Sequence, residues 1–180
     1  MMGRTHMLTG VMAASGTAFV TGADVPSGLI LFSLLPGFAL FNDIDHPDAT
    51  ASRTLGGFTR IPALFMGHRR ETHSLPGIAA LALGTYLATI NLGNVVANCW
   101  LTFVLVVGWL SALRIITTVC KDLKICRIPR GVGWVPVLVA VGVVWWPTEL
   151  AHVGIRFPLW MLPWALGVGM LVHLIGDIRF

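Results

Sequence analysis

Hydrophobic residues along this chain gather into six segments, and the stretches between them hold nearly all the charged side chains. We place the segments at about residues 7–22, 27–42, 75–91, 95–118, 132–147 and 158–176. A helix that crosses a bilayer needs about 20 apolar residues, and the fourth segment is long enough. The first two are short and rich in Gly, Ala and Ser. Because small residues let helices approach closely, we predict that the short segments are tilted or buried among the others.

The composition indicates the environment of these segments. Of the 180 residues, 56% are hydrophobic and only 11% are charged, whereas a soluble domain is typically about 25% charged. Most side chains therefore face lipid or one another. We predict a single all-α domain over residues 1–180, a polytopic membrane bundle of about six helices. The net charge of +4 is attributed to membrane topology, so nucleic-acid binding is not expected.

The basic residues predict the orientation of the bundle. With six spans, eleven of the twelve Lys and Arg residues fall on or near one side, and only Arg156 falls on the other. By the positive-inside rule, that side and both chain termini are cytoplasmic. Omitting the first segment would scatter the charges over both sides, which favours keeping it.

Histidine and aspartate cluster beside the segment ends that share this predicted cytoplasmic side. His6 begins the first segment, and the remaining members follow in three groups: Asp43, Asp45, His46 and Asp48; His68 and His73; His173 and Asp177. Ionisable groups are unfavourable near hydrocarbon, and imidazole with carboxylate is the ligand set of a divalent transition metal such as zinc. The alternatives are turn chemistry around Pro47 and a hydrogen-bonded His173–Asp177 pair that closes the bundle.

The segment before residue 75 combines histidines with positive charge. Ser74 is predicted to cap a helix that has Pro76 in its first turn. Arg69 and Arg70 would lie next to this helix N-terminus, where they would suit a phosphate or another anion. Contact with lipid headgroups is the alternative for both arginines. His152, in contrast, is interpreted as a structural or surface histidine.

These motifs resemble those of the YdjM-type, LexA-regulated, membrane-bound metal-dependent hydrolases. The resemblance spans nearly the whole chain and is carried by four stretches: Gly3-Arg4-Thr5-His6, Asp43-Ile44-Asp45-His46-Pro47, Gly67-His68-Arg69-Arg70-Glu71-Thr72-His73-Ser74-Leu75 and His173-Leu174-Ile175-Gly176-Asp177. The last stretch also resembles the metal-binding helix of the zinc-dependent phospholipase C and P1 nuclease group. That second likeness implies a phosphoester substrate, such as a phospholipid headgroup.

The predicted function is therefore metal-dependent hydrolysis at the cytoplasmic face of a bacterial-type inner membrane. One to three zinc ions would be held by a common set of ligands: His6, Asp43, Asp45, His46, His68, His73, His173 and Asp177. Arg69 and Arg70 would bind an anionic group, and Asp45 is also a candidate base. Membrane lipid is the expected partner. Two alternatives stay open: a metal-binding or ion-translocating protein without hydrolytic activity, and a catalytically inactive member of the family, because relatives commonly continue beyond this motif.

Overall fold

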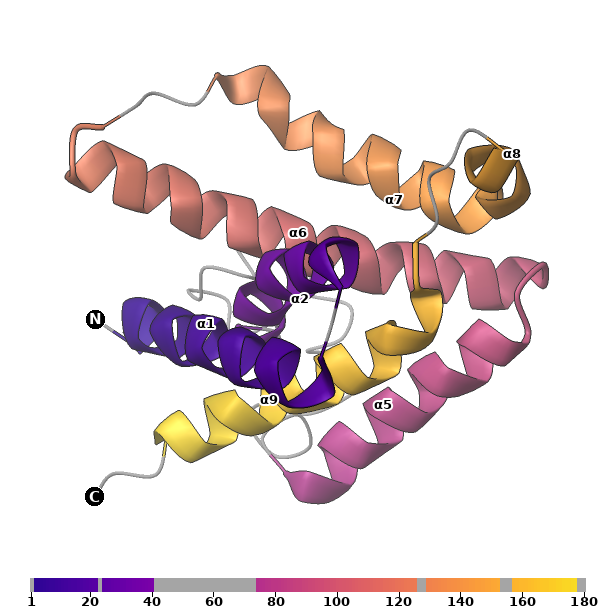
Figure 1. Ribbon diagram of the computed structural model, residues 1–180, viewed down its shortest axis with the longest axis horizontal. Helices are drawn as coiled ribbons and strands as arrows, with labels where there is room; N and C mark the ends of the chain where they lie inside the picture. The colour runs from indigo at the N-terminus through magenta and orange to yellow at the C-terminus, as the bar shows by residue number, and fades with distance from the viewer. Residues whose placement is uncertain (1, 23, 41–73, 126–128, 153–156, 178–180) are drawn as a thin grey trace, which may run out of the picture.

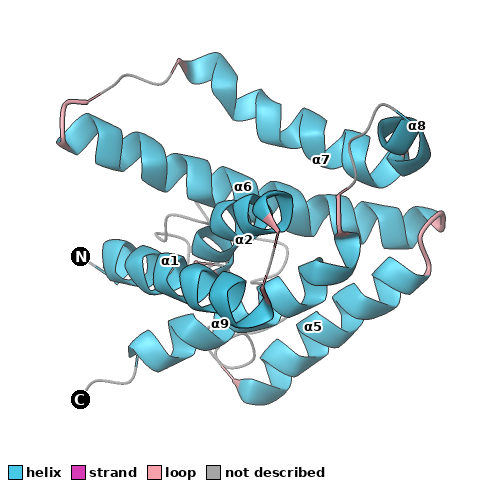
Figure 2. Cartoon of the chain, in the orientation of Figure 1, coloured by secondary structure: helices cyan, strands magenta, loops and turns pink. Residues whose placement is uncertain are grey.

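The described part of the chain is built from helices and short connections. The computed structural model describes residues 2–22, 24–40, 74–125, 129–152 and 157–177, and within these ranges it contains no strand (Figures 1 and 2). The main helices are α1 (Met2–Thr21), α2 (Val25–Phe38), α5 (Leu75–Ile90), α6 (Val95–Asp122), α7 (Val135–Trp145) and α9 (Leu162–Asp177). A short helix, α8 (Pro147–His152), and two 3-10 helices, η3 (Arg130–Trp134) and η4 (Leu159–Met161), complete the described elements. The predicted all-α class is confirmed.

Each of the six predicted hydrophobic segments overlaps one main helix, although α1 begins at Met2, five residues before the predicted start. The largest difference lies in the fifth segment, where α7 has only 11 residues and η3 precedes it. Pro136 stands in the first turn of α7, and Pro147 follows its end and begins α8. Proline has no backbone N–H to donate and therefore favours helix starts. His152 is the last residue of α8, and its side chain is exposed.

Side chains mark where three of the main helices begin. Asp24 accepts a hydrogen bond from the backbone N–H of Ser27 (3.0 Å) at the start of α2. Ser74 accepts one from Gly77 (3.1 Å) at the start of α5, as predicted. Asn94 accepts from Val96 (2.9 Å) at the start of α6. Each cap satisfies an N–H that the helix itself leaves unpaired.

Successive main helices run in alternating directions through the bundle. Figure 1 shows the N-terminal ends of α1 and α7 and the C-terminal ends of α6 and α9 toward the same side, where both chain termini also lie. The tight turn between α5 and α6 lies at the opposite side, and Gly93 adopts a φ of 100° there, which glycine accommodates without strain. These four are among the six helix ends that the sequence assigns to one side.

Helix α2 is the centre of the bundle, with contacts to α1, α6 and α9. Leu31, Leu34, Leu35 and Phe38 are fully or almost fully buried on it. The helix has only 14 residues, or about 21 Å of length, which is less than the hydrocarbon thickness of about 30 Å. Burial among longer neighbours explains how so short an apolar helix is accommodated, as the sequence predicted.

Glycines allow α2 to approach its neighbours closely. A Cβ added to Gly37 would overlap the carbonyl oxygen of Gly108 on α6, and it would lie 2.7 Å from the carbonyl carbon. A Cβ on Gly108 or on Gly169 of α9 would lie 2.6 Å from an atom of the Phe38 side chain. Phe38 is thus held between two helices that have no side chain at the point of contact. Contacts of this kind stabilise helices packed within a membrane.

The outer surface of the bundle, like its core, carries many large apolar side chains. Exposed residues include Phe19 (88%) on α1, Val96 (77%) on α6 and Leu138 (69%) on α7. Two stretches of the described chain, Val95–Asp122 and Leu159–Asp177, are long and apolar enough to cross a membrane, and four shorter apolar helices accompany them. A surface so rich in large apolar side chains is rare on soluble proteins and is typical of contact with lipid.

Candidate metal centre

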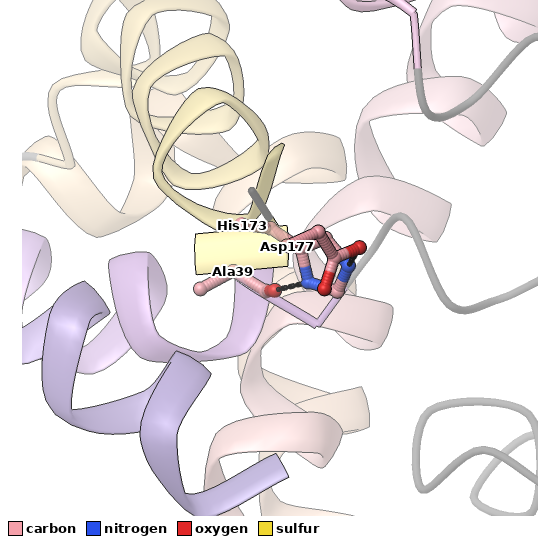
Figure 3. A network of polar contacts seen from close by, with 3 residues as sticks. All are labelled: Ala39, His173 and Asp177. Atoms are coloured by element: carbon pink, nitrogen blue, oxygen red, sulfur yellow. Dashed lines mark hydrogen bonds and ion pairs between the residues drawn. The ribbon is translucent and has the colours of Figure 1, made fainter. Parts of the chain in front are cut away.

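His173 is a buried histidine in an otherwise apolar part of α9. Its side chain is 1% exposed and lies against the C-terminal end of α2 (Figure 3). Asp177 follows at the i, i+4 position, which brings both side chains to the same face of the helix. Asp177 is partly exposed (37%), so the pair extends from the interior of the bundle to its surface.

A backbone carbonyl fixes the histidine ring. Nδ1 of His173 lies 2.5 Å from the carbonyl oxygen of Ala39, the residue that follows α2 (Figure 3). Because a carbonyl oxygen can only accept, Nδ1 must carry the hydrogen and donate it. In a neutral imidazole, this arrangement places the ring lone pair on Nε2.

The second ring nitrogen is directed toward the carboxylate. Nε2 of His173 and Oδ2 of Asp177 are 3.2 Å apart. A lone pair and a carboxylate oxygen at this separation repel each other unless a positive charge lies between or beside them. Two species can supply that charge: a second proton on the imidazole, or a metal cation bound by both atoms.

The separation of the pair is compatible with a shared metal ion as well as with a hydrogen bond from a protonated imidazole. Zinc binds imidazole nitrogen at about 2.0–2.1 Å and carboxylate oxygen at about 2.0–2.2 Å, so two ligands of one tetrahedral zinc ion lie roughly 3.3 Å apart. The observed separation of 3.2 Å is close to this value. A metal-binding histidine also typically donates its other ring N–H to a carboxylate or a backbone carbonyl. The bond from His173 to Ala39 has this form.

The structure places only part of the predicted ligand set. Within the described residues, no group of three or more His, Cys, Asp or Glu side chains converges on one point. His6 lies on α1, which packs against α9, but its side chain is not described. The other predicted site residues lie outside the described ranges: Asp43, Asp45, His46, His68, Arg69, Arg70 and His73.

Two described helices, α2 and α5, flank the segment that carries these residues. Residues 41–73 follow the end of α2 and precede Ser74, which caps α5. Both α2 and α5 pack against α9, the helix of His173 and Asp177. The attachment points thus lie on the neighbours of the candidate centre, whereas the positions of the predicted ligands themselves stay a prediction.

The sequence did not predict the hydrogen bond between His173 and the carbonyl group of Ala39. The last carbonyls of a helix have no partner within that helix and are available to other donors. The end of an apolar segment near residue 40 was therefore a usable signal. Which donor would reach it depends on how α9 packs against α2.

Two carboxyl groups elsewhere have altered acidity for local reasons. Hydrogen bonds from the side chain and the backbone of Ser27 hold the pKa of Asp24 below its usual range. A hydrogen bond from the Thr148 hydroxyl (2.7 Å) similarly lowers the pKa of Glu149 on α8. Both groups are exposed at or near helix starts, so these shifts reflect local hydrogen bonding around helix ends.

The helical architecture and the apolar exterior define the class of protein as a helical membrane protein. The chain belongs to the YdjM inner membrane protein family, whose sequence profile matches residues 1–121. No curated protein sequence and no solved structure matches it. The matched range includes α1, α2, α5 and nearly all of α6, and it ends before His173 and Asp177. The family supports an inner-membrane location, whereas the further likeness to zinc-dependent phospholipase C and P1 nuclease stays a prediction.

Proposed function

We propose that this protein is a multi-pass, metal-dependent hydrolase of the inner membrane that cleaves a phosphoester, such as that of a phospholipid headgroup, at the cytoplasmic face. The observation that supports a metal most strongly is the environment of His173. Its Nδ1 donates to Ala39, and its Nε2 lies 3.2 Å from Oδ2 of Asp177. A bound zinc ion would supply Lewis acidity and lower the pKa of a coordinated water to about 7.

The proposed centre assigns a role to each residue. His173 and Asp177 would bind one ion, with the Ala39 carbonyl holding the imidazole in the binding orientation. The remaining ligands would come from His6, Asp43, His46, His68 and His73, and Asp45 would act as the base rather than as a ligand. Arg69 and Arg70 would hold the negatively charged oxygens of the substrate, because guanidinium groups pair well with phosphate.

The proposed reaction is a hydrolysis. The oxygen of a water molecule bonds to phosphorus while the bond from phosphorus to the leaving oxygen breaks. Asp45 would accept the proton that water releases, and the leaving oxygen departs as an alcohol after taking up a proton. The products are an alcohol and a phosphate monoester when the substrate is a diester.

The direct test is turnover by the purified, zinc-supplied protein. Phosphorus NMR of mixed micelles that contain dioleoyl phosphatidylglycerol detects cleavage of any of its phosphoester bonds. We expect hydrolysis by the wild type and by His152→Ala, whose exposed histidine lies on α8. We expect at least a hundredfold loss in Asp177→Ala. Absence of cleavage by the zinc-loaded wild type, or equal rates in all three proteins, would contradict the proposal.

A further inference from the structure

A groove separate from the candidate metal centre lies between α1, α2, α6 and α7. Its volume is about 370 Å³, which is within the usual range of small-ligand sites, about 300–1,000 Å³. Six of the residues that line it are Phe32, Pro36, Trp109, Leu113, Pro136 and Val139. The groove is therefore large enough to hold part of a ligand between four helices.

The lining of the groove suits hydrocarbon rather than a polar molecule. Its polar side-chain groups are the hydroxyl of Ser33 and the indole N–H of Trp109, and Trp109 donates to Ser33 at 3.0 Å. The Ser33 hydroxyl in turn donates to the carbonyl of Ile30 (2.8 Å). These groups already satisfy one another, so a polar ligand would gain little and would lose its hydration.

The groove lies in the half of the bundle that leads to the candidate metal centre. Pro36 lines it and precedes Ala39, the partner of His173, by three residues, or about 4.5 Å along the helix axis. On α6 the lining residues occupy the C-terminal half, and on α7 they begin at Val135, the first residue of the helix. Hydrocarbon in the groove would thus approach the same end of α2 as His173.

The charges near this end identify the class of lipid. Arg114 follows Leu113 of the groove lining in the sequence, and the end of α6 exposes Lys121, Asp122 and Lys124, so positive charge is in excess there. Positive charges at the polar end of an apolar groove complement an anionic phospholipid.

We infer that this groove binds one acyl chain of an anionic phospholipid and directs its headgroup toward the side of His173. The lipid-binding site itself rests on the groove, its lining and the adjacent charges. The inference that this lipid is also the substrate rests on the proposed function, in which the hydrolysed phosphoester belongs to a membrane lipid. Each methylene withdrawn into such a groove contributes to affinity, so filling the groove should weaken binding at least tenfold.

Two neighbouring residues of α7 provide a matched pair of variants. Val139 lines the groove and is 44% exposed, whereas Leu138 is absent from the groove lining and is 69% exposed. Val139→Trp would fill the groove, and Leu138→Trp would add the same ring to the outer surface. Because both positions are accessible, both variants are expected to fold, which helical circular dichroism checks.

Native mass spectrometry of the detergent-purified protein with added dioleoyl phosphatidylglycerol measures the binding. We expect one retained lipid in the wild type and in Leu138→Trp, with at least a tenfold weaker affinity in Val139→Trp. Equal binding in both variants, or lipid binding that does not saturate, would overturn the inference.

The zinc content of the same samples separates this inference from the proposed function. Loss of lipid in Val139→Trp together with a zinc-free and inactive wild type would support the groove and refute the hydrolase. Zinc-dependent hydrolysis with unchanged lipid binding and turnover in Val139→Trp would refute the groove and leave the hydrolase intact.

Discussion

The close approach of α2 to α6 at Gly37 predicts a large effect of a single methyl group. In Gly37→Ala the new Cβ would overlap the carbonyl oxygen of Gly108 and lie 2.7 Å from its carbonyl carbon. Both atoms belong to backbone and cannot rotate away, so α2 and α6 must separate by roughly 1.5 Å to restore ordinary contact distances. The separation would also loosen Phe38, which packs against Gly108 and Gly169.

The magnitude follows from two effects that act together. Inserting a methyl group into a well-packed interior typically costs about 1–3 kcal/mol, and a gap of 0.5–1 Å removes roughly a quarter to a half of the dispersion energy across it. We therefore expect a loss of about 3 kcal/mol in the free energy of unfolding. For a chain of this size, that corresponds to a decrease in Tm of about 6–12 °C.

The assay is thermal unfolding in detergent, followed by circular dichroism, with Gly84→Ala as the control. Gly84 lies on α5, where an added Cβ meets no atom within 4 Å. Alanine there should leave Tm unchanged or raise it, because alanine has the higher helix propensity. If Gly37→Ala and Gly84→Ala had the same Tm, the described packing of α2 against α6 would be wrong.

Three further predictions concern hydrogen bonding, pH and topology. Ser33→Ala should lower Tm, because it removes the hydrogen-bond acceptor of Trp109 at a cost of about 1 kcal/mol. Ser111→Ala should not lower Tm, because the Ser111 hydroxyl is buried and has no hydrogen-bond partner among the described residues. Equal effects of the two substitutions would contradict this prediction. The pKa of Asp24 is lowered in the folded protein, so its contribution to stability is present above the unfolded-state pKa of about 3.9 and is lost as pH falls through the folded-state pKa. A plot of Tm against pH should consequently fall less steeply below pH 4 for Asp24→Asn than for the wild type, and identical slopes would refute this role. The positive-inside rule places Phe180 and Gly93 on opposite sides of the membrane. Green fluorescent protein fused after Phe180 should therefore fluoresce, and alkaline phosphatase inserted at Gly93 should be active. An active phosphatase fused after Phe180 would contradict the predicted topology.

Much of the helical architecture could be predicted because it follows from local patterns. The apolar segments indicated the six main helices, and Ser74 with Pro76 indicated where α5 begins. The interruption of the fifth segment was harder to predict, because η3 runs directly into α7 in the sequence. The deep burial of α2 was predicted only in general terms, since its partners Gly108 and Gly169 are distant in sequence.

The candidate centre was predictable only in part. The spacing of His173 and Asp177 predicted that they share one helix face, and their side chains do meet. The hydrogen bond to Ala39 crosses between helices far apart in sequence, and only the packing of α9 against α2 reveals it. This bond is informative because it determines which ring nitrogen can bind a cation.

The central claim, a metal ion bound by His173 and Asp177, is tested most directly by elemental analysis of the detergent-purified protein after addition of zinc and removal of the excess. Three proteins are compared: the wild type, Asp177→Ala and His152→Ala. Asp177 is partly exposed, so its removal should leave the helices intact, as circular dichroism would verify. We predict stoichiometric zinc in the wild type and in His152→Ala, and a clear loss in Asp177→Ala. A wild type without zinc, or the same zinc content in all three proteins, would contradict the claim.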